Sequence, residues 1–523
     1  MKKFLAVALV VMMILSTVVL SSCGKSESAM GDDVKNLSYW VPFSSTRAQT
    51  YNDILMYQQR EKDSGVHIDF IHPASGTEAE QFNLLISSGD LPDMIEYDWS
   101  LYPGGPEKAI EDGIIIPIDD YLDKAPNFKK ALESGGLAKT YSKGSTTDTG
   151  KHFGFTSLNI GDYRVFNGPC IRKDLLKKAG LSVPETIDEW TTALRKFKEM
   201  GIPSPLSGQL DYLCYTDHSN FVGAFGIGNR WYIDGNTIKY GPMQDEYKEF
   251  LTLLKMWYDE GLIDKDIATN ESSLVDYKML NNETAALPIL YIGSGLGKYL
   301  PKMEQEHPDW DLVSTPYPVK NKGDINEFPT MEQDTVSMRT IAITSKCKNI
   351  EAAVKWCDFW YSDAGKMLTT FGVEGDTYTM VDGKPTYTDK ILHNPEGMSV
   401  NEAMNFNFRA ASACPGFNQV PEYLEQYYQY DKQKEAFKMW QENTEPGRKH
   451  LIQNLNPTMD ETDTVASIKA DLDTYVDEHI WNFVTGKESL DDYDSFRDTI
   501  KTKFRFDEYQ KIMQAQLDRY NKK

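Results

Sequence analysis

Near the start of the chain, apolar residues alternate between the spacing of a β-strand and that of an α-helix. Five such stretches follow one another, over residues 37–41, 47–62, 66–70, 78–88 and 94–97. Gly65, after the first helical stretch, suits the left-handed position that ends a helix. Because a helix between two strands brings the second strand parallel to the first, the pattern predicts an α/β fold built on a parallel sheet.

The first 22 residues have the layout of a secretory signal, with Lys2 and Lys3 before an apolar run from Phe4 to Leu20. That run alone is also nearly long enough to span a bilayer. The residues Leu-Ser-Ser-Cys that end at Cys23 resemble the bacterial lipobox, in which the Cys is diacylated and the peptide is cut before it. The resemblance implies an extracytoplasmic protein held to the outer face of a bacterial cell membrane by lipid on Cys23.

Residues 23–35 are rich in Gly, Ser, Asp and Lys. Such a segment buries too little apolar surface to offset its chain entropy, so we expect a flexible tether. The whole chain has 523 residues, of which 40% are hydrophobic, enough for a large core in two or more lobes. Its formal net charge of -23, with no concentrated basic patch, argues against nucleic acid as a partner.

The cysteines form no recognisable framework. Five remain besides Cys23, without a Cys-x-x-Cys pair: Cys170, Cys214, Cys347, Cys357 and Cys414. Their odd number and scattered spacing indicate neither a disulfide scaffold nor a zinc site. Cys347 and Cys357 could pair, but we favour buried free thiols.

Large aromatic residues follow two of the predicted strands. Trp40 lies at the end of the first strand, and Tyr97, Asp98 and Trp99 at the end of the third. Ligands of open α/β sheets bind beyond these strand ends. Aromatic rings beside a carboxylate suit a sugar, whose C–H faces lie on the ring while its hydroxyls bond to acids and amides. Each Trp could equally be part of the core.

Several motifs in a fixed order resemble a known family. They are SGDLPD at 88–93, RKDLLKKAGL at 172–181, PETIDEW at 184–190, TAAL at 284–287, RTIAIT at 339–344, EAAVKW at 351–356, GVEG at 372–375 and VTGKE at 484–488. Together they resemble the extracellular solute-binding proteins of family 1, in particular the LplA-like subgroup. These are lipoproteins that feed carbohydrate ABC importers.

The resemblance implies a two-lobed, type II periplasmic-binding-protein-like α/β fold. The expected N-terminal lobe comprises residues 36–158 plus about 340–380, and the C-terminal lobe 159–339 plus about 381–523. Crossings between them are expected near 155–159, 335–339 and 374–384. From about Pro421 the chain reads as an additional helical region, with Thr458 and Glu461 forming a helix cap and Gly486 following the helix end.

The implied function is capture of an oligosaccharide between the lobes by hinge closure, for delivery to the membrane subunits of an ABC importer. We expect a monomer without catalytic residues, cofactor or metal. The candidate ligand contacts lie in loops after predicted strands or at crossings: Trp40, Tyr97, Asp98, Trp99, Asn159, Tyr163, Arg164, Trp231, Tyr291, Glu374 and Tyr378.

Motifs for calcium binding, phosphate binding and nucleophilic catalysis are incomplete or missing in this sequence. Some relatives carry a calcium loop after the helix corresponding to 186–200, but residues 201–206 (GIPSPL) lack its spaced oxygen ligands. The segment 293–298 departs from the phosphate-loop pattern, and no nucleophile elbow is present. Two alternatives stay open: a secreted carbohydrate-active hydrolase with two facing carboxylates, and the same fold binding a non-sugar solute such as a peptide.

Overall fold

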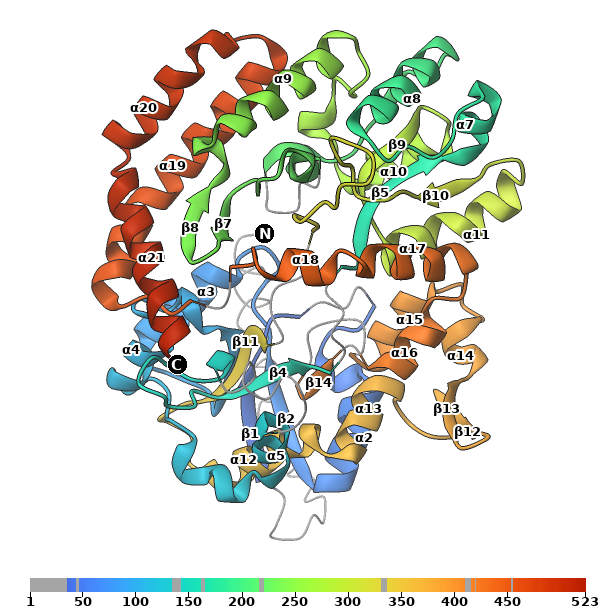
Figure 1. Cartoon of the computed structure of the whole chain (residues 1–523). Helices are drawn as coiled ribbons and strands as arrows, with labels where there is room; N and C mark the ends of the chain where they lie inside the picture. Colours follow the sequence, from blue (N-terminus) through green and yellow to red (C-terminus); the bar gives the residue numbers. More distant parts are fainter. Residues whose placement is uncertain are drawn as a thin grey trace, which may run out of the picture.

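The computed structural model describes residues 35–43, 47–133, 143–160, 165–215, 221–330, 336–409, 415–418, 420–452 and 455–523. Within these ranges, two β-sheets with their covering helices form two lobes, one above the other in Figure 1. The first lobe is built on a sheet of six strands in the order β14-β4-β11-β3-β1-β2. The second lobe is built on a sheet of four strands in the order β10-β5-β9-β6.

The first lobe contains most of the N-terminal third and a middle segment of the chain. Its elements are β1 (Lys35–Trp40), α2 (Leu55–Ser64), β2 (Val66–Ile71), α3 (Glu78–Ser88), β3 (Met94–Asp98), α4 (Gly105–Glu111), α5 (Pro126–Glu133), β4 (Phe155–Asn159), β11 (Val336–Ile343), α12 (Ile350–Asp358), α13 (Asp363–Phe371), β12 (Tyr378–Val381), β13 (Lys384–Tyr387), α14 (Asp389–Leu392), α15 (Val400–Asn407), β14 (Phe417–Asn418) and α16 (Pro421–Tyr427).

The predicted crossover pattern is confirmed in this lobe. Strand β1 pairs parallel with both β2 and β3, and Gly65 ends α2 with a left-handed φ of 65°. The helix expected from residue 47 begins only at Leu55, because Ile54 has an extended backbone after a short turn at 51–53. Strand β11 enters antiparallel to β3, which the sequence pattern could not reveal.

The second lobe contains the elements between residues 167 and 314 and those from residue 431 onward. Its elements are β5 (Asn167–Arg172), α7 (Lys173–Ala179), α8 (Ile187–Glu199), β6 (Ser204–Leu206), β7 (Trp231–Asp234), β8 (Thr237–Tyr240), α9 (Asp245–Asp259), α10 (Ser272–Leu280), β9 (Thr284–Tyr291), α11 (Gly297–Glu306), β10 (Leu312–Ser314), α17 (Asp431–Gln441), α18 (Thr444–Arg448), α19 (Met459–Thr485), α20 (Tyr493–Lys503) and α21 (Phe506–Lys522).

The two predicted helix caps of this lobe are confirmed. Thr186 and Glu189 form a capping box at α8, and Thr458 and Glu461 form another at α19. Gly486 ends α19 with a φ of 74°. Helix α19 packs along α9, and its apolar face joins the core of the second lobe. No helix in the described ranges has both the length and the apolar character needed to cross a membrane.

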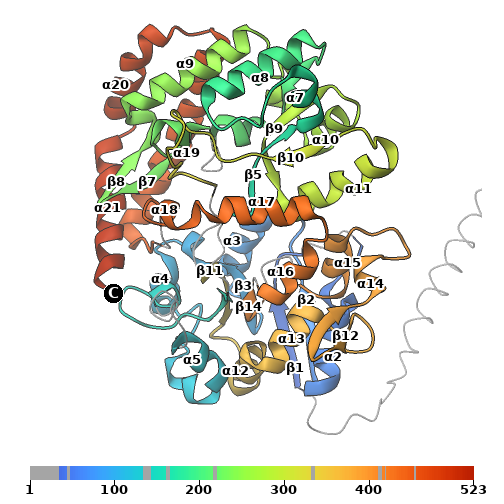
Figure 2. The same ribbon diagram turned by 45° about the vertical axis from the view of Figure 1, so that its right-hand side comes forward.

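The chain passes between the lobes after β4, after β10 and after α16. The third passage differs from the expectation, because residues 384–427 stay with the first lobe: β14 pairs with β4, Phe417 opposite Leu158, and α15 contacts α2. The expected crossing at 374–384 is instead a turn and the start of the β12–β13 hairpin. Helix α17 then lies between the two lobes in both views (Figures 1 and 2).

The described cysteines are free thiols, as expected. Cys170, Cys214, Cys347 and Cys357 are all buried and unbridged. Burial raises the pKa of each thiol, so these cysteines act as small apolar core residues. Cys414 lies outside the described residues.

A buried ion pair lies inside the first lobe. The Arg409 guanidinium donates from Nη2 to Glu96 Oε1 at 3.1 Å and from Nη1 to the Tyr57 hydroxyl at 2.8 Å. The Tyr39 hydroxyl donates to the other Glu96 oxygen. Burial raises the pKa of Glu96, but Arg409 and Arg339 outweigh it, and the pKa lies below its usual value. Glu96 is therefore held ionised in the core.

Candidate functional site

The region between the lobes is bordered by the carboxyl ends of parallel strands. In the first lobe β1, β2, β3, β4 and β14 all run toward it. In the second lobe β6, β9 and β10 end there, where β5 begins. The passages between β4 and β5 and between β10 and β11 connect these same ends. Strand ends of this kind are where α/β sheets bind ligands.

The aromatic residues predicted for the first lobe are mostly interior. The Trp99 ring is fully buried and donates from Nε1 to the Thr340 carbonyl at 3.1 Å. Trp40 is 3% exposed and meets the Tyr97 ring edge-on, with centroids 5.5 Å apart. Tyr97 stacks on Phe82 at 4.4 Å, and burial raises its pKa. In this conformation these three rings pack in the lobe and offer little free surface.

Two polar candidates mark the same strand ends. Asp98 is half-buried and caps the short helical turn 99–101, accepting from the Ser100 amide at 3.0 Å and its hydroxyl at 2.6 Å. Asn159 is the last residue of β4 and is paired with Asn418 across the parallel strands. Trp40, Asp98 and Asn159 are the last residues of β1, β3 and β4, so the structure brings them to the same carboxyl-terminal end of the first sheet.

Two candidates belong to the second lobe. Tyr291 is half-buried at the end of β9, opposite Asn167 of β5. Trp231 begins β7 and is half-buried, with its ring parallel to Phe506 of α21 at 5.4 Å. Tyr509 packs against the same Trp231 ring at 5.0 Å. Trp231 thus attaches the β7–β8 hairpin to α21, whereas Tyr291 lies at the strand ends.

The remaining candidates lie elsewhere. Glu374 is exposed in the turn after α13, and Tyr378 is buried against Phe371 at 5.9 Å. The adjoining β12–β13 hairpin projects at the outer side of the first lobe (Figure 1). These two residues are separated from the strand ends because the expected crossing is a hairpin. Tyr163, Arg164 and the lipidation candidate Cys23 lie outside the described residues.

The structure adds one aromatic group that the sequence pattern did not single out. Phe43, three residues beyond β1, is half-buried and lies 4.6 Å from the His72 ring beyond β2. The Tyr51 amide donates to His72 Nε2 at 3.2 Å, so Nδ1 carries the proton and donates to the Val41 carbonyl at 2.9 Å. Burial lowers the pKa of His72. A neutral imidazole therefore holds this aromatic corner in place.

A second missed group follows β6. Tyr212 and Tyr215 are half-buried in the π-helical turn 211–215, which follows β6 and contacts β9. The Tyr215 carbonyl accepts from Arg230 Nε at 2.8 Å, and Arg230 also pairs with Asp477 of α19. A tyrosine-rich segment after a short strand was the available sequence signal.

Arg339 is a further polar candidate at the strand ends of the first lobe. It lies on β11 in register with Asp98, is one-third exposed, and its Nη2 is 3.6 Å from Glu96 Oε1. Its place beside Asp98 depends on antiparallel pairing of β11 with β3, which joins residues 241 positions apart in the chain. The sequence carries no local signal for such a pair.

Chemically, the strand ends offer aromatic faces, amides, hydroxyls, a carboxylate and a guanidinium. Within the described ranges, no group of three or more His, Cys, Asp or Glu side chains could hold a metal ion. The segment 201–206, which lacks the spaced oxygen ligands of a calcium loop, contains strand β6, paired with β9. The aromatic rings and the polar side chains at the strand ends suit reversible binding of a hydroxyl-rich molecule through hydrogen bonds and ring contacts.

Two α/β lobes joined by several passages of the chain, with polar and aromatic residues at facing strand ends, define a two-lobed solute-binding protein. The chain belongs to the family of bacterial extracellular solute-binding proteins, whose pattern matches residues 37–367.

Curated and solved relatives agree with this assignment. The fructooligosaccharide ABC transporter substrate-binding protein FusA of Streptococcus pneumoniae is 24% identical over 98% of this chain and 97% of its own. Its structure in complex with kestose has a TM-score of 0.73 and 22% identity, covering 93% of this chain and all of that one. The alginate-binding protein AlgQ2 without calcium ion has a TM-score of 0.74 and 22% identity over 93% of this chain and 98% of that chain.

Proposed function

We propose that this protein is the lipid-anchored binding subunit of an ABC importer and captures an oligosaccharide between its two lobes. The observation that supports the proposal is the set of strand ends on both lobes, with Asp98 and Arg339 at those of the first lobe, Phe43 just beyond β1, Tyr291 at the end of β9 and Tyr212 beyond β6. A ligand that touches both lobes makes its full contacts only when they are close together, so it shifts the population toward the closed form.

The relatives support the sugar class. FusA is named for fructooligosaccharides, and YtcQ of Bacillus subtilis, 24% identical over 50% of this chain and 52% of its own, is named for polygalacturonan and rhamnogalacturonan. The ring faces and hydrogen-bonding groups at the strand ends fit that chemistry. We propose Phe43, Tyr212 and Tyr291 as the ring contacts, with Asp98, Asn159 and Arg339 as hydroxyl partners. Tyr163 and Arg164 remain proposed contacts from the passage between β4 and β5.

Ligand addition should raise the melting temperature of the protein. A ligand that binds only the folded state, at about 100 times its dissociation constant, adds about 2.7 kcal/mol of apparent stability. We would screen kestose and nystose, oligogalacturonates and a tripeptide mixture by differential scanning fluorimetry, then titrate each hit by calorimetry. Stabilisation by the peptides alone would overturn the sugar proposal.

The same incubations test the absence of catalysis. We expect a bound oligosaccharide to be recovered uncleaved after a day at 37 °C, because a binding protein needs ring contacts and hydrogen bonds but no paired general acid and base. Chromatography of the mixture checks this. Release of shorter sugars by the purified protein would favour a hydrolase instead.

Cys23→Ser should abolish lipid attachment. The proposed acyl chains need the Cys sulfur, and each buried methylene contributes about 0.8 kcal/mol to membrane binding. In cells labelled with a radioactive fatty acid, the wild-type protein should carry label and sediment with membranes. Label on the Ser variant would contradict an anchor at this position.

Once anchored, the protein is proposed to act as a monomer that presents its closed form to the importer's membrane subunits.

A further inference from the structure

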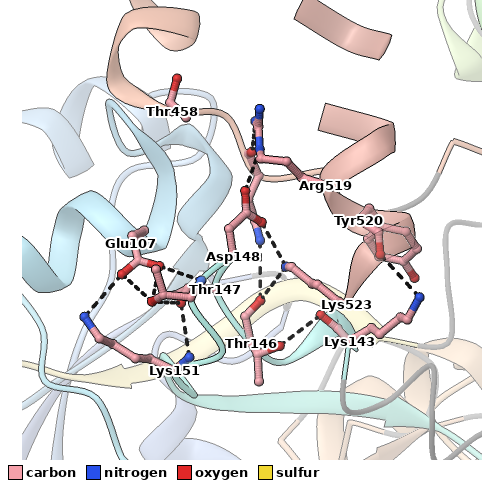
Figure 3. A network of polar contacts seen from close by, with 12 residues as sticks. Glu107, Lys143, Thr146, Thr147, Asp148, Lys151, Thr458, Arg519, Tyr520 and Lys523 are labelled. Atoms are coloured by element: carbon pink, nitrogen blue, oxygen red, sulfur yellow. Dashed lines mark hydrogen bonds and ion pairs between the residues drawn. The ribbon is translucent and has the colours of Figure 1, made fainter. Parts of the chain in front are cut away.

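The last turn of α21 reaches across from the second lobe and contacts a loop of the first lobe. This loop, residues 143–152, precedes β4, and Figure 3 shows the polar contacts between the two. We call the four charged residues Asp148, Glu461, Arg519 and Lys523 the ionic latch. Glu461 comes from the first turn of α19, Arg519 from the last turn of α21, and Lys523 directly follows α21.

Arg519 is the centre of the ionic latch. Its Nε donates to Asp148 Oδ2 at 2.7 Å, across the lobe boundary. Its Nη1 and Nη2 donate to the two Glu461 oxygens at 2.8 and 2.6 Å, a bidentate pair that fixes the guanidinium plane. Nη2 also donates to the Asn456 carbonyl at 3.0 Å. Arg519 therefore joins α19 and α21 to the loop of the first lobe.

Lys523 reinforces the same contact. Its Nζ lies 3.1 Å from Asp148 Oδ1 and donates to the Thr146 carbonyl at 3.0 Å. From the other direction, Lys143 Nζ donates to the Tyr520 carbonyl at 3.3 Å. The side chain of Lys523 is 10% exposed and that of Asp148 is 24% exposed. Partly buried, multiply bonded charges of this kind contribute more than isolated surface pairs.

Each side of the contact is fixed to its own lobe. In the loop, Thr149 and Lys151 bond to Glu107 of α4, and the His152 amide donates to Asp119 at 3.0 Å. On the other side, Gln514 of α21 accepts from the Ile238 amide of β8 at 2.8 Å. Because both partners are held rigidly by their lobes, a relative rotation of the lobes must change the Asp148–Arg519 distance.

A neighbouring backbone contact accompanies the ionic latch. The Gly104 amide, just before α4, donates to the Thr462 hydroxyl of α19 at 3.0 Å. At Gly104 a side chain has no space, because a Cβ would lie 2.7 Å from the Lys108 Cβ and 3.2 Å from the Met459 Cα. The beginning of α19 and the end of α21 thus rest together on the first lobe.

The ionic latch and the α16–α17 connection lie at opposite sides of the molecule. In Figure 1 α21 is at the left and α16 at the right. At the right, the lobes are joined covalently through the chain between α16 and α17. At the left, the contact between α21 and the loop is made by side chains and can open without unfolding either lobe.

We propose that the ionic latch is a conformational device that limits how far the lobes separate in the absence of ligand. It rests on the lobe closure of the proposed function but not on the identity of the ligand. By restricting the open ensemble, it keeps the strand ends of the two lobes near their binding arrangement and so increases ligand affinity. The C-terminal helices thus control binding at a distance from the ligand.

The primary test measures the lobe distance without ligand. Spin labels are placed at Leu84→Cys in α3 of the first lobe and Met200→Cys after α8 of the second, positions that are 61% and 40% exposed. Singly labelled proteins give the background. We expect Arg519→Gln and Asp148→Asn each to broaden the electron–electron distance distribution and shift it to longer values. At 1 M salt the Debye length is about 3 Å, so the ionic latch is weakened and the distances in the parent protein should shift in the same direction.

Arg497→Gln is the matched control. Arg497 makes the same kind of contacts, to Asp245 at 2.6 Å and Asp494 at 2.5 Å, but both partners are in the second lobe. Its distance distribution should equal that of the parent. Thermal melts confirm that each variant is folded, and Lys523→Gln offers a milder change if Arg519→Gln is poorly folded. Unchanged distributions in the folded latch variants, or the same change in Arg497→Gln, would overturn the proposal.

A second arm uses whichever sugar binds in the screen, beginning with kestose. Loss of the ionic latch should weaken binding about fivefold or more, within the usual range of coupling between distant sites. Tighter binding by Arg519→Gln would overturn the proposal, because it would mean that the contact opposes closure. If no sugar binds the parent protein, the proposed function fails, while the ligand-free distances still decide on the ionic latch.

Discussion

Glu96→Gln should lower the free energy of unfolding by about 3–5 kcal/mol, the usual cost of removing one partner of a buried ion pair. Glu96 and Arg409 have side chains only 4% and 2% exposed, and Arg339 stands close by. Without the carboxylate charge, the Arg409 guanidinium loses its ion pair with Glu96 and stays buried beside the ring of Tyr51 and the hydroxyl of Tyr57. Urea denaturation at pH 7, followed by tryptophan fluorescence, measures the loss.

Two further variants make this result specific. Lys196→Gln breaks an exposed pair with Glu199 and should cost less than about 1 kcal/mol. Arg409→Met in the Glu96→Gln background removes the remaining buried charge and should recover part of the stability. If Glu96→Gln costs no more stability than Lys196→Gln, the buried pair of Glu96 and Arg409 contributes little to the free energy of unfolding.

The same pair gives a pH dependence with a defined sign. The pKa of Glu96 is lower in the folded protein than its usual value, so the unfolded chain binds the proton more readily. Stability from Glu96 is therefore complete above the usual value of about 4.3 and decreases as the pH falls through the lower, folded pKa. The Glu96→Gln variant should lose less stability than the parent over this acidic interval.

Trp99→Ala should cost about 3–5 kcal/mol of stability while leaving sugar affinity per folded molecule unchanged. The ring is fully buried beside Phe82, with centroids 5.6 Å apart, and its Nε1 donates to the Thr340 carbonyl. Truncation leaves a large cavity and an unsatisfied carbonyl. Thermal denaturation and calorimetric titration on the same sample separate the two effects.

Trp99→Phe is the matched comparison, because it keeps an aromatic ring but removes the Nε1 donor. We expect a smaller stability loss than for Trp99→Ala. Phe43→Ala, at the half-buried aromatic corner, should show the opposite pattern, with reduced affinity and a nearly parental melting temperature. A large affinity loss in Trp99→Ala with normal stability would return Trp99 to the binding surface.

Local sequence features determined much of this protein. The strand and helix spacing of residues 37–97 predicted the parallel core of the first lobe. Thr186 with Glu189, and Thr458 with Glu461, predicted where α8 and α19 begin, since a capping box needs only residues three apart. The ordered motifs predicted the family and the two-lobed fold.

The tertiary structure alone decided which residues meet. Whether Trp99 is core or ligand contact depends on the helices and strands that cover it, not on its position after a strand. The placement of 384–427 follows from β14 pairing with β4, and that of Arg339 beside Asp98 from strand pairing across 241 residues. Asp148 and Arg519 are 371 residues apart, yet they meet across the lobes. Such contacts depend on long-range packing and register, for which the local spacing of residues carries no information.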